Sequence, residues 1–145
     1  MKSYLFKVSL SLLLILVASF SFAQKNNSVE FEKTTLKFKK VNEGEVVKLT
    51  YTFKNLGKHA LNIIPPEVDC SCTEVKIPEN KIAGGASDSI IVIFNTKDKI
   101  GFQQRDVKIQ FVSDLMDSQS IDKTITFKGM VRASEATKKK YKSSH

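Results

Sequence analysis

The segment VVKLTYTFK, residues 46–54, decides the fold class. Within it the apolar side chains Val47, Leu49, Tyr51 and Phe53 alternate with polar ones. Successive side chains of a β-strand point to opposite faces, so a period of two predicts a strand with one buried face and one solvated face. β-branched and aromatic residues also suit a half-buried pleated surface. This stretch therefore predicts a strand of a sheet that covers a core.

Similar strand signals occur on both sides of this stretch, separated by turn residues. They lie at residues 29–32, 36–39, 61–63, 73–77, 89–94, 105–112 and 125–131. Residues 89–94 are almost all apolar, which predicts a central strand covered on both faces. No segment has a convincing helical period. Seven or eight short strands at regular spacing predict an all-β fold, an immunoglobulin-like antiparallel β-sandwich.

The first 23 residues have the pattern of a secretory signal peptide. Lys2 and Lys7 provide a positively charged start, and residues Val8 to Phe22 are apolar apart from serines. Cleavage is expected between Ala23 and Gln24. The alternative is an uncleaved membrane anchor, but the run is shorter than the roughly 20 apolar residues that span a bilayer and is interrupted by serines. No cysteine follows the cleavage site, so a lipoprotein is not expected. We expect a periplasmic or secreted protein.

The remaining 122 of the 145 residues suit one domain. We expect a polar leader at 24–28, the sandwich domain at 29–132 and a Lys-rich disordered tail at 133–145. The formal net charge is +8, and removing the two lysines of the signal peptide leaves +6. Half of that excess lies in the tail, and the other charges are interspersed, which does not indicate nucleic-acid binding.

The tail carries four lysines that could hold the protein weakly to an anionic surface, at about 1 kcal/mol for each basic residue. They are Lys138, Lys139, Lys140 and Lys142. The alternative is a tail that only solubilises the protein, because runs of like charge are usually solvated.

A set of short motifs, in this order, resembles the domain of unknown function 1573 family. The motifs are FKNLG at 53–57, LNI at 61–63, CSCT at 70–73, IIVIFNT at 90–96, Gly101 and ITFKGMV at 125–131. The resemblance implies an exported bacterial protein with an immunoglobulin-like sandwich related to the ASH and major-sperm-protein type. It implies no established activity. The sequence departs from the family pattern at Ser71, where glycine is usual between the cysteines, and at Gly84-Gly85, where Pro-Gly is usual.

The two cysteines, Cys70 and Cys72, allow three interpretations. They can be buried structural thiols, because cysteine is among the most buried residue types. They can form a local disulfide, which needs Cα atoms within about 6.8 Å and therefore a bend in the chain. They can bind a soft metal such as copper(I), or a zinc shared between chains. In that third case the remaining candidate ligand in the folded part is His59.

A candidate binding loop surrounds the cysteines. Its residues are Pro66, Glu67, Asp69, Ser71 and Thr73, and the loops 95–101 and 114–120 are further candidates. The folded part has a single histidine and no recognisable nucleophile–base motif, so no enzyme and no cofactor are expected. We expect a non-enzymatic binding or scaffold module with an unknown partner in the cell envelope. The alternative is a thiol–disulfide or copper-handling protein that uses Cys70 and Cys72.

Overall fold

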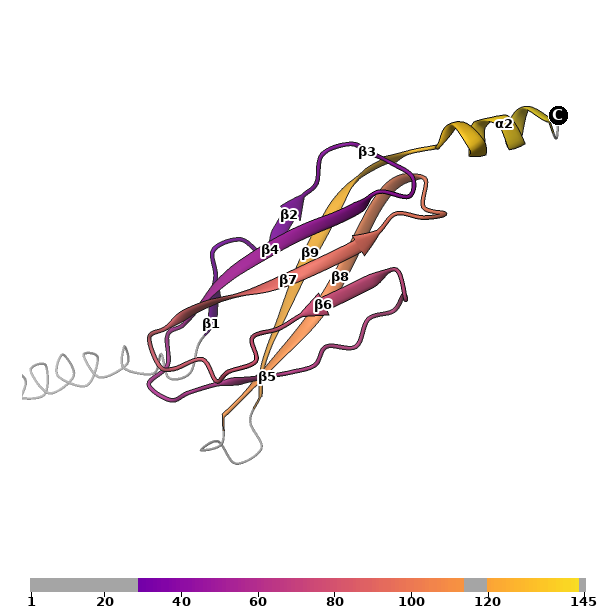
Figure 1. The fold of residues 1–145 in the computed structure, drawn as a ribbon. Coiled ribbons are helices and arrows are strands. Elements are labelled where there is room, and N and C mark those ends of the chain that lie inside the picture. The colour runs from indigo at the N-terminus through magenta and orange to yellow at the C-terminus, as the bar shows by residue number, and fades with distance from the viewer. Residues whose placement is uncertain (1–28, 114–119, 144–145) are drawn as a thin grey trace, which may run out of the picture.

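The computed structural model describes residues 29–113 and 120–143, which form two packed sheets and one short helix (Figure 1). The expected signal peptide and leader lie outside the described residues, as do residues 114–119 of one candidate loop. The first sheet, here called sheet A, is antiparallel throughout, in the order β1-β4-β7-β6. Its strands are β1 (Val29–Phe31), β4 (Val46–Asn55), β7 (Ser87–Asn95) and β6 (Thr73–Lys76).

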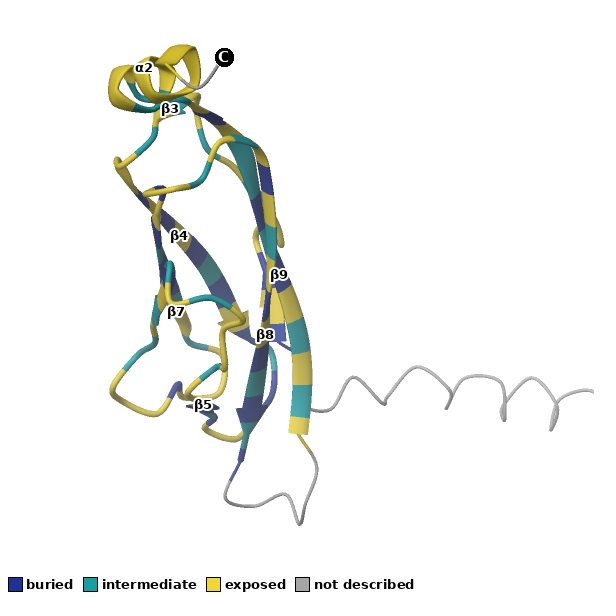
Figure 2. Cartoon of the chain, turned by 90° about the vertical axis from the view of Figure 1, so that its right-hand side faces the viewer, coloured by how far each residue is buried: buried dark blue, intermediate teal, exposed yellow. Residues whose placement is uncertain are grey.

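The second sheet, sheet B, contains the two longest strands and has the order β2-β9-β8-β5, with β3 also pairing with β9. Its strands are β2 (Thr35–Lys37), β9 (Ser120–Arg132), β8 (Gly101–Val112), β5 (Asn62–Ile64) and β3 (Val41–Asn42). Figure 2 shows the two sheets edge-on, with buried and exposed residues alternating along the strands. The structure confirms the predicted immunoglobulin-like β-sandwich.

Two details of the predicted sandwich are wrong. Strands β2 and β3 pair parallel to β9, so sheet B is mixed and not wholly antiparallel. The cause is that the chain crosses from sheet A to sheet B after β1 and then runs alongside β9 in the same direction. Strand β8 also begins at Gly101 and not at Arg105. Polar Gln103 occupies a buried position there, which interrupts the apolar alternation used to place the strand.

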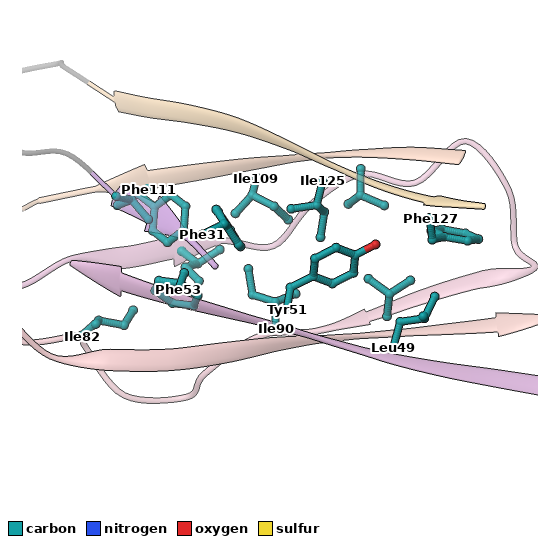
Figure 3. Packing of buried hydrophobic residues seen from close by; sticks show 14 of the residues in the cluster. Phe31, Leu49, Tyr51, Phe53, Ile82, Ile90, Ile109, Phe111, Ile125 and Phe127 are labelled. Carbon is teal, nitrogen blue, oxygen red and sulfur yellow. The ribbon is translucent and has the colours of Figure 1, made fainter. Parts of the chain in front are cut away.

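The core lies between the sheets and contains the apolar face that the alternation predicted (Figure 3). Phe53 of sheet A meets Phe111 of sheet B with ring centroids 5.2 Å apart. The hydroxyl of Tyr51 donates a hydrogen bond of 2.7 Å to the carbonyl of Thr126, which links the sheets. Burial raises the pKa of Tyr51 to about 12.

The central strand β7 is buried on one face only. Ile90, Val92 and Phe94 are fully buried, whereas Ile91 and Ile93 on the other face are half-buried. The predicted central position is correct, because β7 lies between β4 and β6. The predicted cover on both faces is wrong, because no second layer packs over this outer face within the described residues.

The tail, expected to be disordered, instead forms helix α2 (Glu135–Ser143). Ser134 caps it by accepting a hydrogen bond from the Thr137 N–H at 3.2 Å. The Glu43 carboxylate accepts from the Ser134 N–H at 3.0 Å and from the Thr137 hydroxyl at 2.6 Å. These bonds satisfy amide groups that a helix start leaves open, which stabilises so short a helix. No residue of α2 is buried. Nowhere in the described ranges is a helix long and apolar enough to cross a membrane.

Candidate functional site

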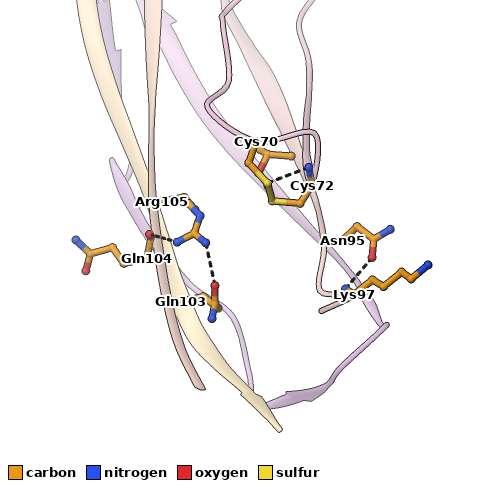
Figure 4. Close-up of a disulfide and its surroundings, with 8 residues drawn as sticks. Cys70, Cys72, Asn95, Lys97, Gln103, Gln104 and Arg105 are labelled. Carbon is orange, nitrogen blue, oxygen red and sulfur yellow. Dashed lines mark hydrogen bonds between the residues drawn. A yellow bond between two sulfur atoms is a disulfide. The ribbon is translucent and has the colours of Figure 1, made fainter. Parts of the chain in front are cut away.

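The structure joins Cys70 and Cys72 in a disulfide within the connection from β5 to β6 (Figure 4). Their Cα atoms are 5.1 Å apart, so the chain bends as a local disulfide requires. A tight turn makes this bend, because the Thr73 N–H donates to the Cys70 carbonyl at 3.0 Å. The Cys72 N–H donates to Cys70 Sγ at 3.1 Å. The pair is half-buried, and Cys72 packs against the core.

The turn is tied to sheet A where β7 ends. The Asn95 N–H donates to the Cys72 carbonyl at 2.8 Å, and Thr73 pairs with Phe94 in the ladder. Ser71, where the related family usually has glycine, is exposed and does not adopt a positive φ. This turn therefore does not need glycine for its backbone conformation. The disulfide closes a ring of only three residues, so it adds little chain-entropy stabilisation.

The proposed metal set is not brought together. His59 lies at the far end of β4, where its carbonyl accepts from the Asn55 side chain at 2.8 Å. Cys72 lies beside Asn95, which pairs with Val46 at the opposite end of the same sheet. Strand β4 has 10 residues; at about 3.4 Å per residue, it separates the two ends by roughly 30 Å. Among the described residues, no three His, Cys, Asp or Glu side chains form a metal-binding group. Within one chain, His59 therefore does not join the two cysteines in a metal site.

The predicted binding loop divides into exposed and buried residues. Those exposed to solvent are Glu67, Asp69 and Ser71, whereas Pro66 is half-buried. Thr73 is 7% exposed, so its side chain is part of the packed interior and not of a binding surface. The accessible part of the loop therefore presents two carboxylates and a hydroxyl beside the disulfide.

A buried amide that the sequence analysis did not single out organises the other end of the sandwich. Asn55 is 0% exposed, and its Nδ2 donates to the carbonyls of His59, Ile82 and Ala83 at 2.8, 3.1 and 3.2 Å. Its Oδ1 accepts from the Gly57 N–H at 2.9 Å. One side chain thus holds two loops. The sequence feature that could have identified it is its position, because Asn55 continues the inward-facing series of β4 after Phe53.

A charged residue on an inward-facing position of β8 was also missed as a site residue. Arg105 is half-buried, and its guanidinium folds back along the strand (Figure 4). It donates to the Gln104 carbonyl at 2.8 Å and to Gln103 Oε1 at 3.0 Å. Both acceptors are neutral, and no carboxylate in the described part of the chain forms an ion pair with Arg105. The sequence feature that could have identified Arg105 is its positive charge at a position where the alternation predicts an apolar residue.

Comparisons with known proteins agree with this fold. The model of a family described as "Protein of unknown function (DUF1573)" matches residues 29–131. No curated protein matches the sequence.

Solved structures with the same fold have low sequence identity to this chain. The ASH/PapD-like domain 7 of human CEP192 is similar with a TM-score of 0.60 and 10% identity, over 74% of this chain and 87% of that domain. The periplasmic chaperone SfaE has a TM-score of 0.54 and 11% identity, over 72% of this chain and 58% of that one. The VesB protease of Vibrio cholerae has a TM-score of 0.56 and 17% identity, over 73% of this chain and 32% of that one. The chain therefore corresponds to only part of the latter two proteins.

Proposed function

This chain belongs to the DUF1573 family of proteins of unknown function, and on that premise we propose that it is a non-enzymatic binding or scaffold module of the periplasm or cell envelope. The observation that carries the proposal is how the sandwich uses its buried polar side chains. Asn55 and Gln103 donate to backbone carbonyls, as does the Thr96 hydroxyl, which reaches Asn42 O and Glu45 O at 3.1 and 2.7 Å. These groups hold loops in place and do not converge on a reacting atom.

The two groups with shifted pKa values among the described residues also serve the fold. Tyr51 is buried in the core, and the pKa of Glu43 is lowered by hydrogen bonds from Thr137 and Ser134 at the start of α2. Catalytic sites usually gather shifted groups in one place, whereas these two have separate structural roles. Loops and strand edges on a rigid sandwich are instead typical binding surfaces.

Export is the first part of the proposal to test. The support is the lysine-flanked apolar run ending at Ala23, and the same fold occurs in a protein described as a periplasmic chaperone. The chain should be expressed with its own N-terminal segment, and the cell fractions should be analysed by intact mass. We expect a form that begins at Gln24 in the soluble envelope fraction. A full-length form retained in the membrane fraction would contradict export as a soluble protein.

Binding can be tested by crosslinking from the exposed loop. A photo-crosslinking amino acid at Glu67 should give a discrete adduct with an envelope protein. The same amino acid at Asn80, in another exposed loop, serves as the matched control. The control position should give no adduct. Absence of any adduct from Glu67 and from the strand edges as well would contradict a binding function.

A second candidate function is favoured by the disulfide itself. Because Cys70 and Cys72 are half-buried in a short surface loop, a reductant can reach the bond. We propose thiol–disulfide exchange or copper(I) handling as the alternative; copper binding requires prior reduction, because thiolates are the ligands. Reduced glutathione or thioredoxin should then raise the intact mass by two hydrogens without unfolding the domain. Resistance to both reductants in the folded protein would exclude this alternative.

A further inference from the structure

Within residues 29–113 and 120–143, one long strand edge of sheet B has no neighbouring strand. Strand β8 pairs with β9 along its whole length, from Gly101 to Val112. On its other side it pairs with β5 only at Gln110–Val112. In the described part of the chain, residues 101–109 of β8 therefore have a strand on one side and none on the other.

The backbone groups that face this open side can be identified from the register. Lys128 O accepts from the Phe38 N–H, and the Thr126 N–H donates to Thr34 O, so these two residues of β9 turn their backbone groups away from β8. Their partners in β8 are Gln104 and Asp106. In an antiparallel ladder, a pair that is not hydrogen-bonded turns both members' groups outward. The N–H and C=O groups of Gln104 and Asp106 therefore point to the free edge.

Arg105 lies at the centre of this edge and has no anionic partner among the described residues. It folds back onto Gln104 O, one of the outward-facing carbonyls, and onto the neutral Gln103 side chain. The Asp106 side chain lies on the opposite face of β8, where its Oδ1 accepts from the Thr126 hydroxyl at 2.7 Å, so it does not pair with Arg105. Lys108 is a further cation on this strand, and Lys128 lies opposite Gln104.

We propose that the free edge of β8 binds an extended acidic segment of a partner protein, which adds as a further strand of sheet B and places a carboxylate on Arg105. An added strand satisfies the open backbone groups, and the carboxylate replaces neutral acceptors with a charge-assisted pair. This inference rests on the proposed binding function and specifies its surface. A second copy of the chain is a poor occupant, because a two-fold centred on this strand sets Arg105 against its own copy.

The edge also sets the spacing of the partner's side chains. Phe102 is 61% exposed and lies three residues before Arg105, on the opposite face of the strand. An antiparallel partner meets both when an acidic residue precedes an apolar residue by three positions. The acidic side chain then faces Arg105, and the apolar one packs on Phe102 and its cross-strand neighbour Met130, which is 40% exposed.

The test uses the full chain expressed for export and a labelled peptide that alternates threonine and valine, with one glutamate followed three positions later by isoleucine. Fluorescence anisotropy measures binding, and hydrogen exchange locates it. We expect protection of the Gln104 and Asp106 amides. Arg105→Gln should weaken binding about tenfold, and the matched Arg132→Gln less than twofold. Gln104→Pro should weaken binding at least tenfold, because it removes an edge N–H without removing a bond to β9.

The peptide provides a control that needs no altered protein. Replacing its glutamate with glutamine should weaken binding to the wild type about tenfold and leave binding to Arg105→Gln unchanged, which is the signature of a direct pair. Equal affinity for the two peptides, or unchanged binding to a folded Gln104→Pro variant, would overturn the proposal. So would a concentration-dependent dimer that protects the same amides. Envelope adducts from Glu67 whose yield is unchanged in Arg105→Gln would overturn this surface while leaving the proposed function in place.

Discussion

Replacing Asn55 tests whether one buried amide holds an end of the sandwich. Its Nδ2 donates to three carbonyls on two loops, its Oδ1 accepts from Gly57, and it is 0% exposed. A net hydrogen bond contributes about 1 kcal/mol, and the buried Gly57 N–H left without its acceptor adds to the loss. We therefore expect Asn55→Ala to lower the free energy of unfolding by about 3–4 kcal/mol, a large share of the roughly 5–15 kcal/mol of a typical domain.

Asn55→Asp sharpens the same test through its pH dependence. A carboxylate at this position faces three carbonyl oxygens, so the folded state favours the protonated acid and raises its pKa above the unfolded value. A raised carboxyl pKa means that stability is greatest at low pH and is lost as the pH rises through the unfolded pKa, near 4. The variant should therefore be less stable than Asn55→Ala at pH 7 and should recover relative to it below about pH 4.

Urea unfolding followed by circular dichroism measures both effects, since the chain has no tryptophan. The control is Asn80→Ala in an exposed loop, which should change stability by less than about 0.5 kcal/mol. An Asn55→Ala variant that loses less than about 1 kcal/mol would refute the reasoning. So would an Asn55→Asp variant whose stability relative to Asn55→Ala does not depend on pH.

Three further predictions concern single contacts. Gly84→Ala should destabilise the domain by more than about 2 kcal/mol, because its Cβ would overlap the Lys58 backbone carbonyl. The Cβ of Gly85→Ala meets open space, so this variant should lose only about 1 kcal/mol for its φ of +79°. Thermal melting should therefore give a lower melting temperature for Gly84→Ala than for Gly85→Ala. The Tyr51 hydroxyl loses its proton near pH 10 in the unfolded chain but only near pH 12 in the folded one, so it lowers the stability of the wild type between these pH values. Tyr51→Phe should remove this loss, which urea titrations at alkaline pH can measure. Glu43→Gln should fray α2 at pH 7, and the wild type should show the same fraying only as the pH falls below 4.5 through the lowered pKa of Glu43; amide exchange of residues 135–143 measures both.

The sequence predicted the strands whose apolar side chains alternate. The series from Val47 to Phe53 lies on the inner face of β4 as expected, and its next member, Asn55, shows where this reasoning stops. Periodicity places a side chain on a face but does not identify its hydrogen-bond partners, which here come from residues 59, 82 and 83. An asparagine is common in turns, whereas Asn55 is a buried support in this structure.

The missed features depend on contacts between distant segments. Helix α2 begins where the Glu43 carboxylate meets Ser134, a contact across 91 residues that composition does not reveal. The predicted strand started too late, at Arg105, because the polar side chain of Gln103 on an inward-facing position interrupts the apolar alternation. The cysteine pair was predicted with three alternatives, and the bend that joins its members became visible only from the turn at Thr73.

The pairing of β2 and β3 with β9 has a consequence for the order in which the domain assembles. Leu36 is a ladder neighbour of Phe127, although the two are 91 positions apart, and the final strand is also the one on which β8 depends. A ribosome or a translocation channel delivers the N-terminal part first, so β2 and β3 have no strand to pair with until β9 emerges. Contacts of such high sequence separation slow folding. A nascent chain that lacks β9 therefore cannot complete sheet B, whereas every strand of sheet A has already been delivered by Asn95.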